Sequence, residues 1–229
     1  MPSKTADKQL VEAAKAGDTE SVARLVAAGA DPRAGKSEAL RWAARNGHEE
    51  CVRALIPVSS PGAANSVALA EASRNGHVEC VKLLAPVSDC SAGECWALRM
   101  AAAGGHEECM EMLLEVAGPT VKKSEALGHA ARGGHARCVK LLLESSGPLF
   151  DIDDIFRSAL SLGRAEVVLT MIGHKPELID AVDLRQSLAE AVENGWRDFA
   201  AALSSIIEKE ELASIVSASP ARGAAQARL

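Results

Sequence analysis

The chain has 229 residues and a formal net charge of −6, an acidic balance that argues against a protein devoted to nucleic acid or to an anionic membrane. Hydrophobic residues make up 48% of the sequence, but aromatic residues only 3%, and Tyr is absent. A core built from Ala, Leu and Val favours closely packed helices over a β-sandwich. Residues 1–10 lack the apolar segment of a secretory signal, and no stretch reaches the roughly 18 apolar residues of a membrane span. We therefore expect a cytoplasmic protein, with export into a host cell left open.

The chain begins with two short predicted helices. The first covers Lys8–Lys15 and is closed by Gly17, and the second covers Asp18–Ala28 with apolar residues at helical spacing. The segment Gly29–Pro32 ends the second helix, because Gly favours the residue after a helix and Pro cannot continue one. The sequence therefore predicts a helix-turn-helix unit at the N-terminus.

The same pattern then recurs at a fixed spacing. In the second unit, one helix is predicted over Glu38–Arg45 and another over His48–Ile56, which Pro57 ends. Between them lies a tight turn, where Gly or Asn adopts a positive φ at little cost. The turn glycine and its histidine return every 29 residues, at Gly47-His48, Gly76-His77, Gly105-His106 and Gly134-His135. A fixed spacing of this kind indicates a tandem repeat.

The later part of the chain continues the array in a less regular form. A sixth unit covers Asp154–Met171 and a seventh Leu184–Leu203, with atypical sequences at the ends as expected of capping units. We expect a repeat domain over residues 1–207, and a C-terminal capping helix and flexible tail over residues 208–229. Residues 208–216 either extend the final helix or form a separate short helix.

The repeated pattern resembles the ankyrin repeat. The matching stretches are Leu40–His48 (Leu-Arg-Trp-Ala-Ala-Arg-Asn-Gly-His), Gly134–Leu143 and the loop Gly29–Pro32, and the resemblance covers roughly residues 7–205. It implies an all-α solenoid of about seven stacked helix-turn-helix repeats. It also implies a non-catalytic protein-binding module.

Two features depart from the ankyrin pattern. The Thr-Pro opening of the first helix is absent, which removes the usual threonine cap, and the period is 29 residues instead of 33. Since the helices keep their length, the missing residues must come from the connection between units. We therefore expect short loops and little or no β-hairpin. A leucine-rich repeat can have this period, but its strand motif does not occur in the sequence.

Cysteines and histidines also recur once per unit. Stacked helices lie about 8–10 Å apart, whereas a disulfide needs Cα atoms within about 7 Å and a shared metal needs closer ligands still. We therefore interpret both sets as structural. The cysteines are expected to be buried packing residues, and the histidines are expected to form hydrogen bonds to the backbone of neighbouring units. The repeated cysteines are Cys51, Cys80, Cys109 and Cys138. Cys90 and Cys95 share one loop, where we expect free thiols in the cytoplasm.

No catalytic, metal-binding or cofactor-binding pattern is present in the sequence, so we expect a protein that is not an enzyme. In ankyrin proteins the first helix of each unit lines the concave face, where partners dock. Arg and Trp, which are typical anchors of interfaces, gather at these positions in a chain of net negative charge. We expect an acidic protein partner. The candidate partner-binding residues are Arg41, Trp42, Arg45, Arg74, Arg99, Arg132 and Arg157.

Three other interpretations remain. The same face could be a solvated surface on which arginine stems cover alanines. The chain could be a structural or self-assembling array that uses its ends, or an inhibitor or regulator of an enzyme. Nucleic acid is disfavoured, because no aromatic residues are interleaved with the basic ones. We expect no membrane association and a monomer.

Overall fold

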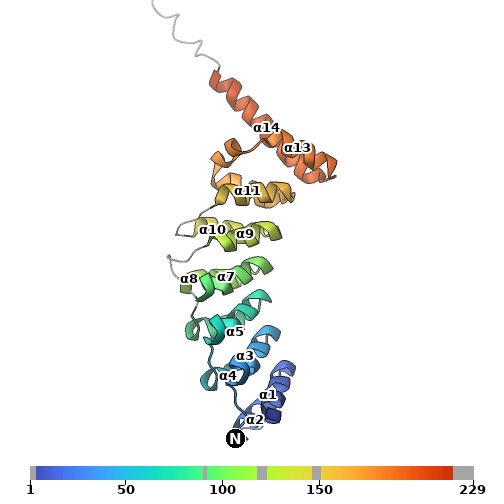
Figure 1. Ribbon diagram of the computed structural model, residues 1–229. Helices are drawn as coiled ribbons and strands as arrows, with labels where there is room; N and C mark the ends of the chain where they lie inside the picture. The colour runs from blue at the N-terminus through green and yellow to red at the C-terminus, as the bar shows by residue number, and fades with distance from the viewer. Residues whose placement is uncertain (1–3, 90–91, 118–122, 146–150, 219–229) are drawn as a thin grey trace, which may run out of the picture.

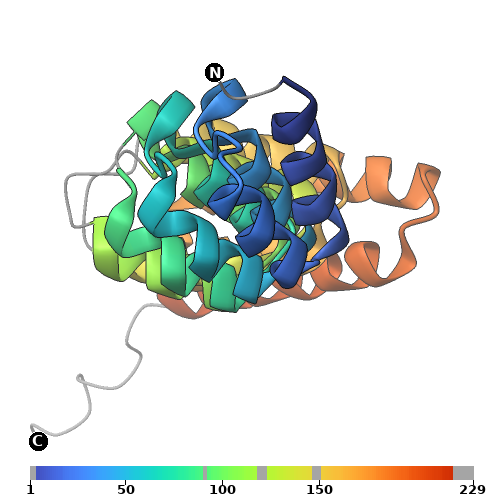
Figure 2. The ribbon, with the colours of Figure 1, turned by 90° about the horizontal axis from the view of Figure 1, so that it is seen from below.

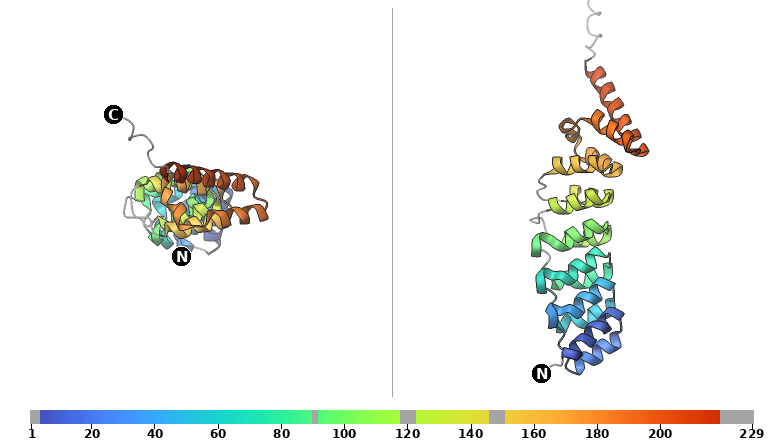
Figure 3. Two further views of the ribbon diagram at one scale, coloured as in Figure 1. Left: turned by 90° about the horizontal axis from the view of Figure 1, so that it is seen from above. Right: turned by 45° about the vertical axis from the view of Figure 1, so that its right-hand side comes forward.

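The chain forms an extended stack of helical hairpins (Figure 1; Figure 3, right). The computed structural model describes residues 4–89, 92–117, 123–145 and 151–218, and within these ranges the chain contains α-helices and short 3-10 segments but no strand. Seven hairpins follow one another in sequence order. This arrangement confirms the predicted all-α solenoid of about seven units with short connections. No helix of the described residues is long and apolar enough to cross a membrane.

Each hairpin contributes a first and a second helix. The first helices are α1 (Lys4–Ala16), α3 (Ala34–Asn46), α5 (Ala63–Arg74), α7 (Ala92–Gly104), α9 (Ser124–Gly133), α11 (Ile152–Ser161) and α13 (Leu184–Glu193). The second helices are α2 (Thr19–Ala27), α4 (Glu49–Leu55), α6 (Val78–Leu84), α8 (Glu107–Ala117), α10 (Ala136–Glu144), α12 (Ala165–His174) and α14 (Arg197–Ala218). The 3-10 segments are η1 (Ile56–Val58), η2 (Ala85–Val87) and η3 (Pro176–Ala181).

One continuous core runs between the two rows of helices, from Leu10 to Leu203. Seen along the stack, successive hairpins lie over one another (Figure 2). From α1 to α9 the first helices pack against one another more closely than the second helices do. The buried positions of the first helices are rich in alanine, which lets neighbouring backbones approach. Closer packing along one row bends a stack toward that row, which supports the expected concave placement of the first helices.

Short connections join the hairpins. α4 and α6 end just before Pro57 and Pro86, where the chain tightens into η1 and η2, as expected for residues that cannot continue a helix. At the start of α3 and α5 a buried serine bonds to the exit loop, and no side chain caps either helix. The buried Ser37 Oγ accepts a hydrogen bond from the N–H of Ser60 at 3.0 Å, and Ser66 Oγ does the same with Asp89 at 3.0 Å. Each serine thereby ties the start of its unit to the exit loop of the same unit.

The last hairpin differs from the others. α13 and α14 are tilted away from the stack (Figure 1), and they meet it mainly through α14 against α12. α14 runs without interruption through residue 208, so residues 208–216 extend the final helix and do not form a separate one. A domain division at 207/208 stays a prediction, and the tail at residues 219–229 lies outside the described residues.

Candidate partner-binding face

Histidines connect each hairpin to the previous one. The ring Nε2 of His48 donates to the carbonyl oxygen of Lys15 at 2.9 Å. The pattern continues with His77 to Arg45 (2.9 Å), His106 to Arg74 (2.9 Å) and His135 to Ala103 (3.2 Å), and Arg164 Nε makes the same contact with Arg132 (2.9 Å). This set of contacts confirms the predicted structural role of the histidines.

These bonds also position the basic residues. Each accepting carbonyl belongs to the last turn of a first helix, and four of those five residues are basic: Lys15, Arg45, Arg74 and Arg132. The histidine of the next unit therefore fixes the backbone from which each basic side chain projects. We call the exposed surface of the first helices, where these side chains lie, the helix-one face.

Trp42 forms the centre of one cluster on this face. The Nζ of Lys15 lies 4.6 Å and the Cζ of Arg45 lies 5.1 Å from the centre of the Trp42 ring, which are cation–π distances. The ring Nε1 donates to Glu38 at 3.4 Å. A hollow of about 420 Å³ opens beside this cluster between α1 and α3, with Val11 among its lining residues. The cluster thus joins Trp42 to two cations and borders the hollow through Lys15 and Glu38.

The other predicted arginines have different surroundings. Arg45 Nε lies 4.0 Å from Glu71, and Arg99 forms an ion pair with Glu125 of the next unit. Arg157 pairs within its own helix with Asp154 at 3.1 Å, and Arg41 donates to the carbonyl of Gly35 at 3.5 Å. Within the described residues, no ion pair is recorded for Arg41, Arg74 or Arg132.

The predicted set is therefore not one uniform stripe. Trp42 and Arg45 come together with Lys15, which was not among the candidate residues, and Arg157 stands apart with Asp154. The neutralising role of Glu71 and Glu125 was also missed. A comparison of repeats could have indicated Glu71, because it occupies the position of Trp42 one unit later.

A second hollow on this face, of about 280 Å³, lies between α9 and α11. Gly128, His129 and Arg132 line it from α9, and Asp151 from the other side. Burial lowers the pKa of His129 below its usual value, and the charges of Arg132 and Arg99 lower it further. His129 is therefore neutral at pH 7, which leaves Arg132 as the cation that lines the hollow.

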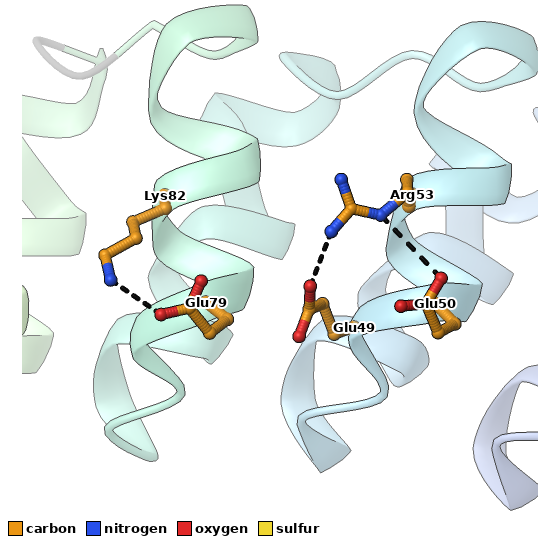
Figure 4. A network of polar contacts seen from close by, with 5 residues as sticks. All are labelled: Glu49, Glu50, Arg53, Glu79 and Lys82. Atoms are coloured by element: carbon orange, nitrogen blue, oxygen red, sulfur yellow. Dashed lines mark hydrogen bonds and ion pairs between the residues drawn. The ribbon is translucent and has the colours of Figure 1, made fainter.

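The second helices carry their basic residues in another way (Figure 4). Arg53 pairs with Glu49 at 2.5 Å and with Glu50 at 3.7 Å, and Lys82 pairs with Glu79 at 2.6 Å. These acids precede their cations by one helical turn, a spacing at which exposed pairs stabilise a helix by about 0.2–0.5 kcal/mol. Each of these cations is thus balanced by acids of its own helix.

The four repeated cysteines lie in the core, with relative exposures of 0–1%. Burial raises the pKa of Cys80, Cys109 and Cys138 to about 11. These three thiols are therefore protonated at neutral pH and unreactive, because the thiolate is the reactive form of cysteine. The predicted packing role is confirmed. The prediction that Cys90 and Cys95 share a loop was wrong for Cys95, whose backbone lies in α7, while Cys90 and the side chain of Cys95 lie outside the described residues. Among the described residues no cluster of His, Cys, Asp or Glu is arranged to hold a metal ion.

Comparisons with known proteins agree with this architecture. A family model described as ankyrin repeats in three copies matches residues 10–94 and again residues 69–154. Among solved structures, the crystal structure of the human ASB11 ankyrin repeat domain is similar, with a TM-score of 0.63 and 23% sequence identity over 72% of this chain and 83% of that chain. A search of curated proteins found no match. Because the matched residues make up more than half of the sequence, the chain belongs to the ankyrin-repeat family.

Proposed function

We propose that this chain is a non-catalytic interaction module that binds an acidic segment of a protein partner through the helix-one face. Ankyrin repeats are generally protein–protein interaction modules, but one scaffold serves many unrelated partners. The chemistry of the partner must therefore be argued from the face itself.

The observation that carries the proposal is the contrast between the two rows of helices. Arg74 and Arg132 are exposed on the helix-one face without a recorded ion pair among the described residues, whereas Arg53 and Lys82 on the second helices are paired locally. In a chain of net charge −6, unbalanced positive charge on one side attracts an acidic surface and orients it. Trp42 adds an aromatic anchor of the kind that dominates binding energy at interfaces.

A purely structural explanation exists for part of this pattern. Arg45, Arg74 and Arg132 lie in the last turn of their helices, where a cation stabilises the helix dipole by about 0.3–1 kcal/mol. A test of binding must therefore record the stability of each variant, so that loss of a helix is not mistaken for loss of a contact.

The test reverses three charges on each row. One variant carries Arg45→Glu, Arg74→Glu and Arg132→Glu, and the control carries Arg53→Glu, Lys82→Glu and Arg137→Glu on the second helices. Both have the same net charge. Immobilised wild-type protein and both variants are used to capture partners from native lysate at low salt, and thermal unfolding is measured for each. We expect the first variant to lose an acidic partner that the control retains. Equal capture by both variants would contradict the proposal.

Self-assembly through the C-terminal end is a second candidate. The position three residues before the turn glycine is buried in the inner units, as at Ala44, Ala102 and Leu160, but its counterpart Val192 in the last unit is 64% exposed. An uncovered apolar end can pair with another copy. Light scattering over a concentration series decides this, and a monomer at every concentration removes the candidate. Whether a captured partner is an enzyme that the module regulates follows from its identity.

A further inference from the structure

One position on the helix-one face lacks a side chain. Equivalent positions carry Arg41, Ala70, Arg99 and Arg157, but the fifth unit has Gly128 in the interior of α9. The hollow of about 280 Å³ between α9 and α11 opens over this glycine. Gly128 itself is buried, because the guanidinium of Arg132 lies over it, and the hollow opens beside this pair.

The scaffold does not need a glycine at this position. Gly128 does not have a positive φ, and a Cβ placed on it would meet only the guanidinium of Arg132 at 3.5 Å or more, which is ordinary van der Waals contact. Glycine in a helix interior is less stable than alanine, because it loses more conformational freedom on folding. No packing contact therefore requires glycine at position 128, where the guanidinium of Arg132 lies against the helix beside the hollow.

The charges around the hollow favour an anion on one side. Arg132 lies over Gly128, and within the described residues no ion pair is recorded for it. Glu125 at the rim pairs with Arg99 of the previous unit. Asp151 lines the opposite side at the start of α11, and Ile155 adds an apolar wall. A guest with an apolar stem and a carboxylate directed at Arg132, away from Asp151, fits this arrangement.

We propose that the hollow over Gly128 is an anchor site for an aspartate or glutamate side chain of the acidic partner, with Arg132 as its ion-pair partner. This inference rests on the proposed function, since it assigns one contact within that surface. The stem of the guest lies in the hollow beside Gly128 and against Ile155, and the carboxylate accepts hydrogen bonds from the guanidinium of Arg132.

The test fills the hollow without changing any charge. The probe is a fluorescein-labelled peptide of ten glutamates, and its affinity for the full chain is measured by fluorescence anisotropy at low salt. Gly128→Ala and Gly128→Leu are expected to keep or raise the midpoint of thermal unfolding. Gly128→Leu is expected to weaken binding about tenfold or more, as loss of one charge-assisted contact does. The control is Gly173→Leu on α12, where a Cβ would meet nothing within 4 Å, and its affinity should equal that of the wild type.

Two further variants address the charges. Arg132→Gln should weaken binding as much as Gly128→Leu, and Asp151→Asn should strengthen it by removing a like charge. If Gly128→Leu is destabilised, the affinities of Gly128→Ala, Arg132→Gln and Asp151→Asn for the glutamate peptide test the anchor site instead.

The outcomes separate the two proposals. Unchanged affinity of Gly128→Leu, while the triple reversal on the helix-one face loses the probe, overturns the anchor and leaves the proposed function standing. A wild-type chain that does not bind the glutamate probe, or a triple reversal that binds it as well as the wild type, contradicts the acidic partner and the anchor together.

Discussion

At the scale of the residue, Gly76 and Gly128 differ in whether the backbone and the neighbouring side chains require a glycine. Gly76 has a φ of 72°, in the left-handed region, and a Cβ on it would lie 2.5 Å from Nδ1 of His106. Gly128 has neither constraint. The repeated Gly-His pair is therefore one device, in which the glycine both turns the chain and makes room for the next histidine ring.

The first prediction follows from this pair. Gly76→Ala is expected to lower the free energy of unfolding by about 2 kcal/mol or more, because a left-handed conformation costs an L-residue about 1–2 kcal/mol and the new Cβ also strikes His106. Urea denaturation measures the change.

A double variant serves as the control for this prediction. His106→Ala removes the ring, so Gly76→Ala should cost less in that background than in the wild type, and the two effects should be non-additive. If the losses in unfolding free energy of the two single variants add up to that of the double variant, the contact between position 76 and the His106 ring does not contribute to the cost of Gly76→Ala.

At the scale of the element, the sequence predicted the hairpins and their turns because the signals are local. Helical spacing, Gly at positive φ and Pro at the helix end each act within a few residues, and the positions of α4, Gly47 and η1 agree with them. The charge partners of the helix-one face could not be predicted in this way. The pairing of Arg99 with Glu125, or of Lys15 with Trp42, joins residues a whole unit apart, and it depends on how neighbouring helices are rotated.

The tie made by serine is another contact that the sequence did not indicate. Ser66 is 2% exposed, and its Oγ also donates to the carbonyl of Asp89 at 3.2 Å, so one hydroxyl satisfies both backbone groups of that residue. The missing Thr-Pro pair predicts only the loss of the threonine cap, and no side chain caps α5. A single serine before the helix carries no local signal that its hydroxyl reaches a loop 23 residues later.

The second prediction tests this tie. Ser66→Ala removes the hydroxyl that bonds to both backbone groups of Asp89, and a hydrogen bond of this kind contributes about 0.5–1.5 kcal/mol to stability. We expect a loss in that range by urea denaturation and faster hydrogen exchange at the Asp89 amide.

Ser66→Gly separates the hydroxyl from the backbone conformation. Ser66 has a φ of 58°, which glycine adopts more easily than serine. Exchange at Asp89 should be as fast in Ser66→Gly as in Ser66→Ala. Exchange that stays slow in both variants would mean that the hydroxyl does not hold the loop.

At the scale of the whole molecule, the stack is not uniform. In a repeat protein the stability is roughly a sum of units and of the interfaces between neighbours. The inner hairpins meet through both rows of helices, whereas the last hairpin meets the stack mainly through α14 against α12. Trp196 stands where the inner units have histidine, and its ring packs against the turn at Gly163, where a Cβ would lie 2.5 Å from it. The last interface is therefore small, and the ring of Trp196 is one of its contacts beside the buried Phe199 and Leu203.

The third prediction is that the last hairpin opens before the rest of the stack. Native-state hydrogen exchange should give lower opening free energies for α13 and α14 than for α3 to α10, since sub-global openings follow the weakest interface. Trp196→Ala should lower the protection of α13 and α14 further and leave the inner helices unchanged, because each unit contacts only its neighbours. The comparison variant is Trp42→Ala on the helix-one face, which removes a ring of the same size but should not affect the last hairpin. Equal protection along the whole chain, or a fall in all helices together in Trp196→Ala, would mean that the seven hairpins unfold as one cooperative unit despite the smaller last interface.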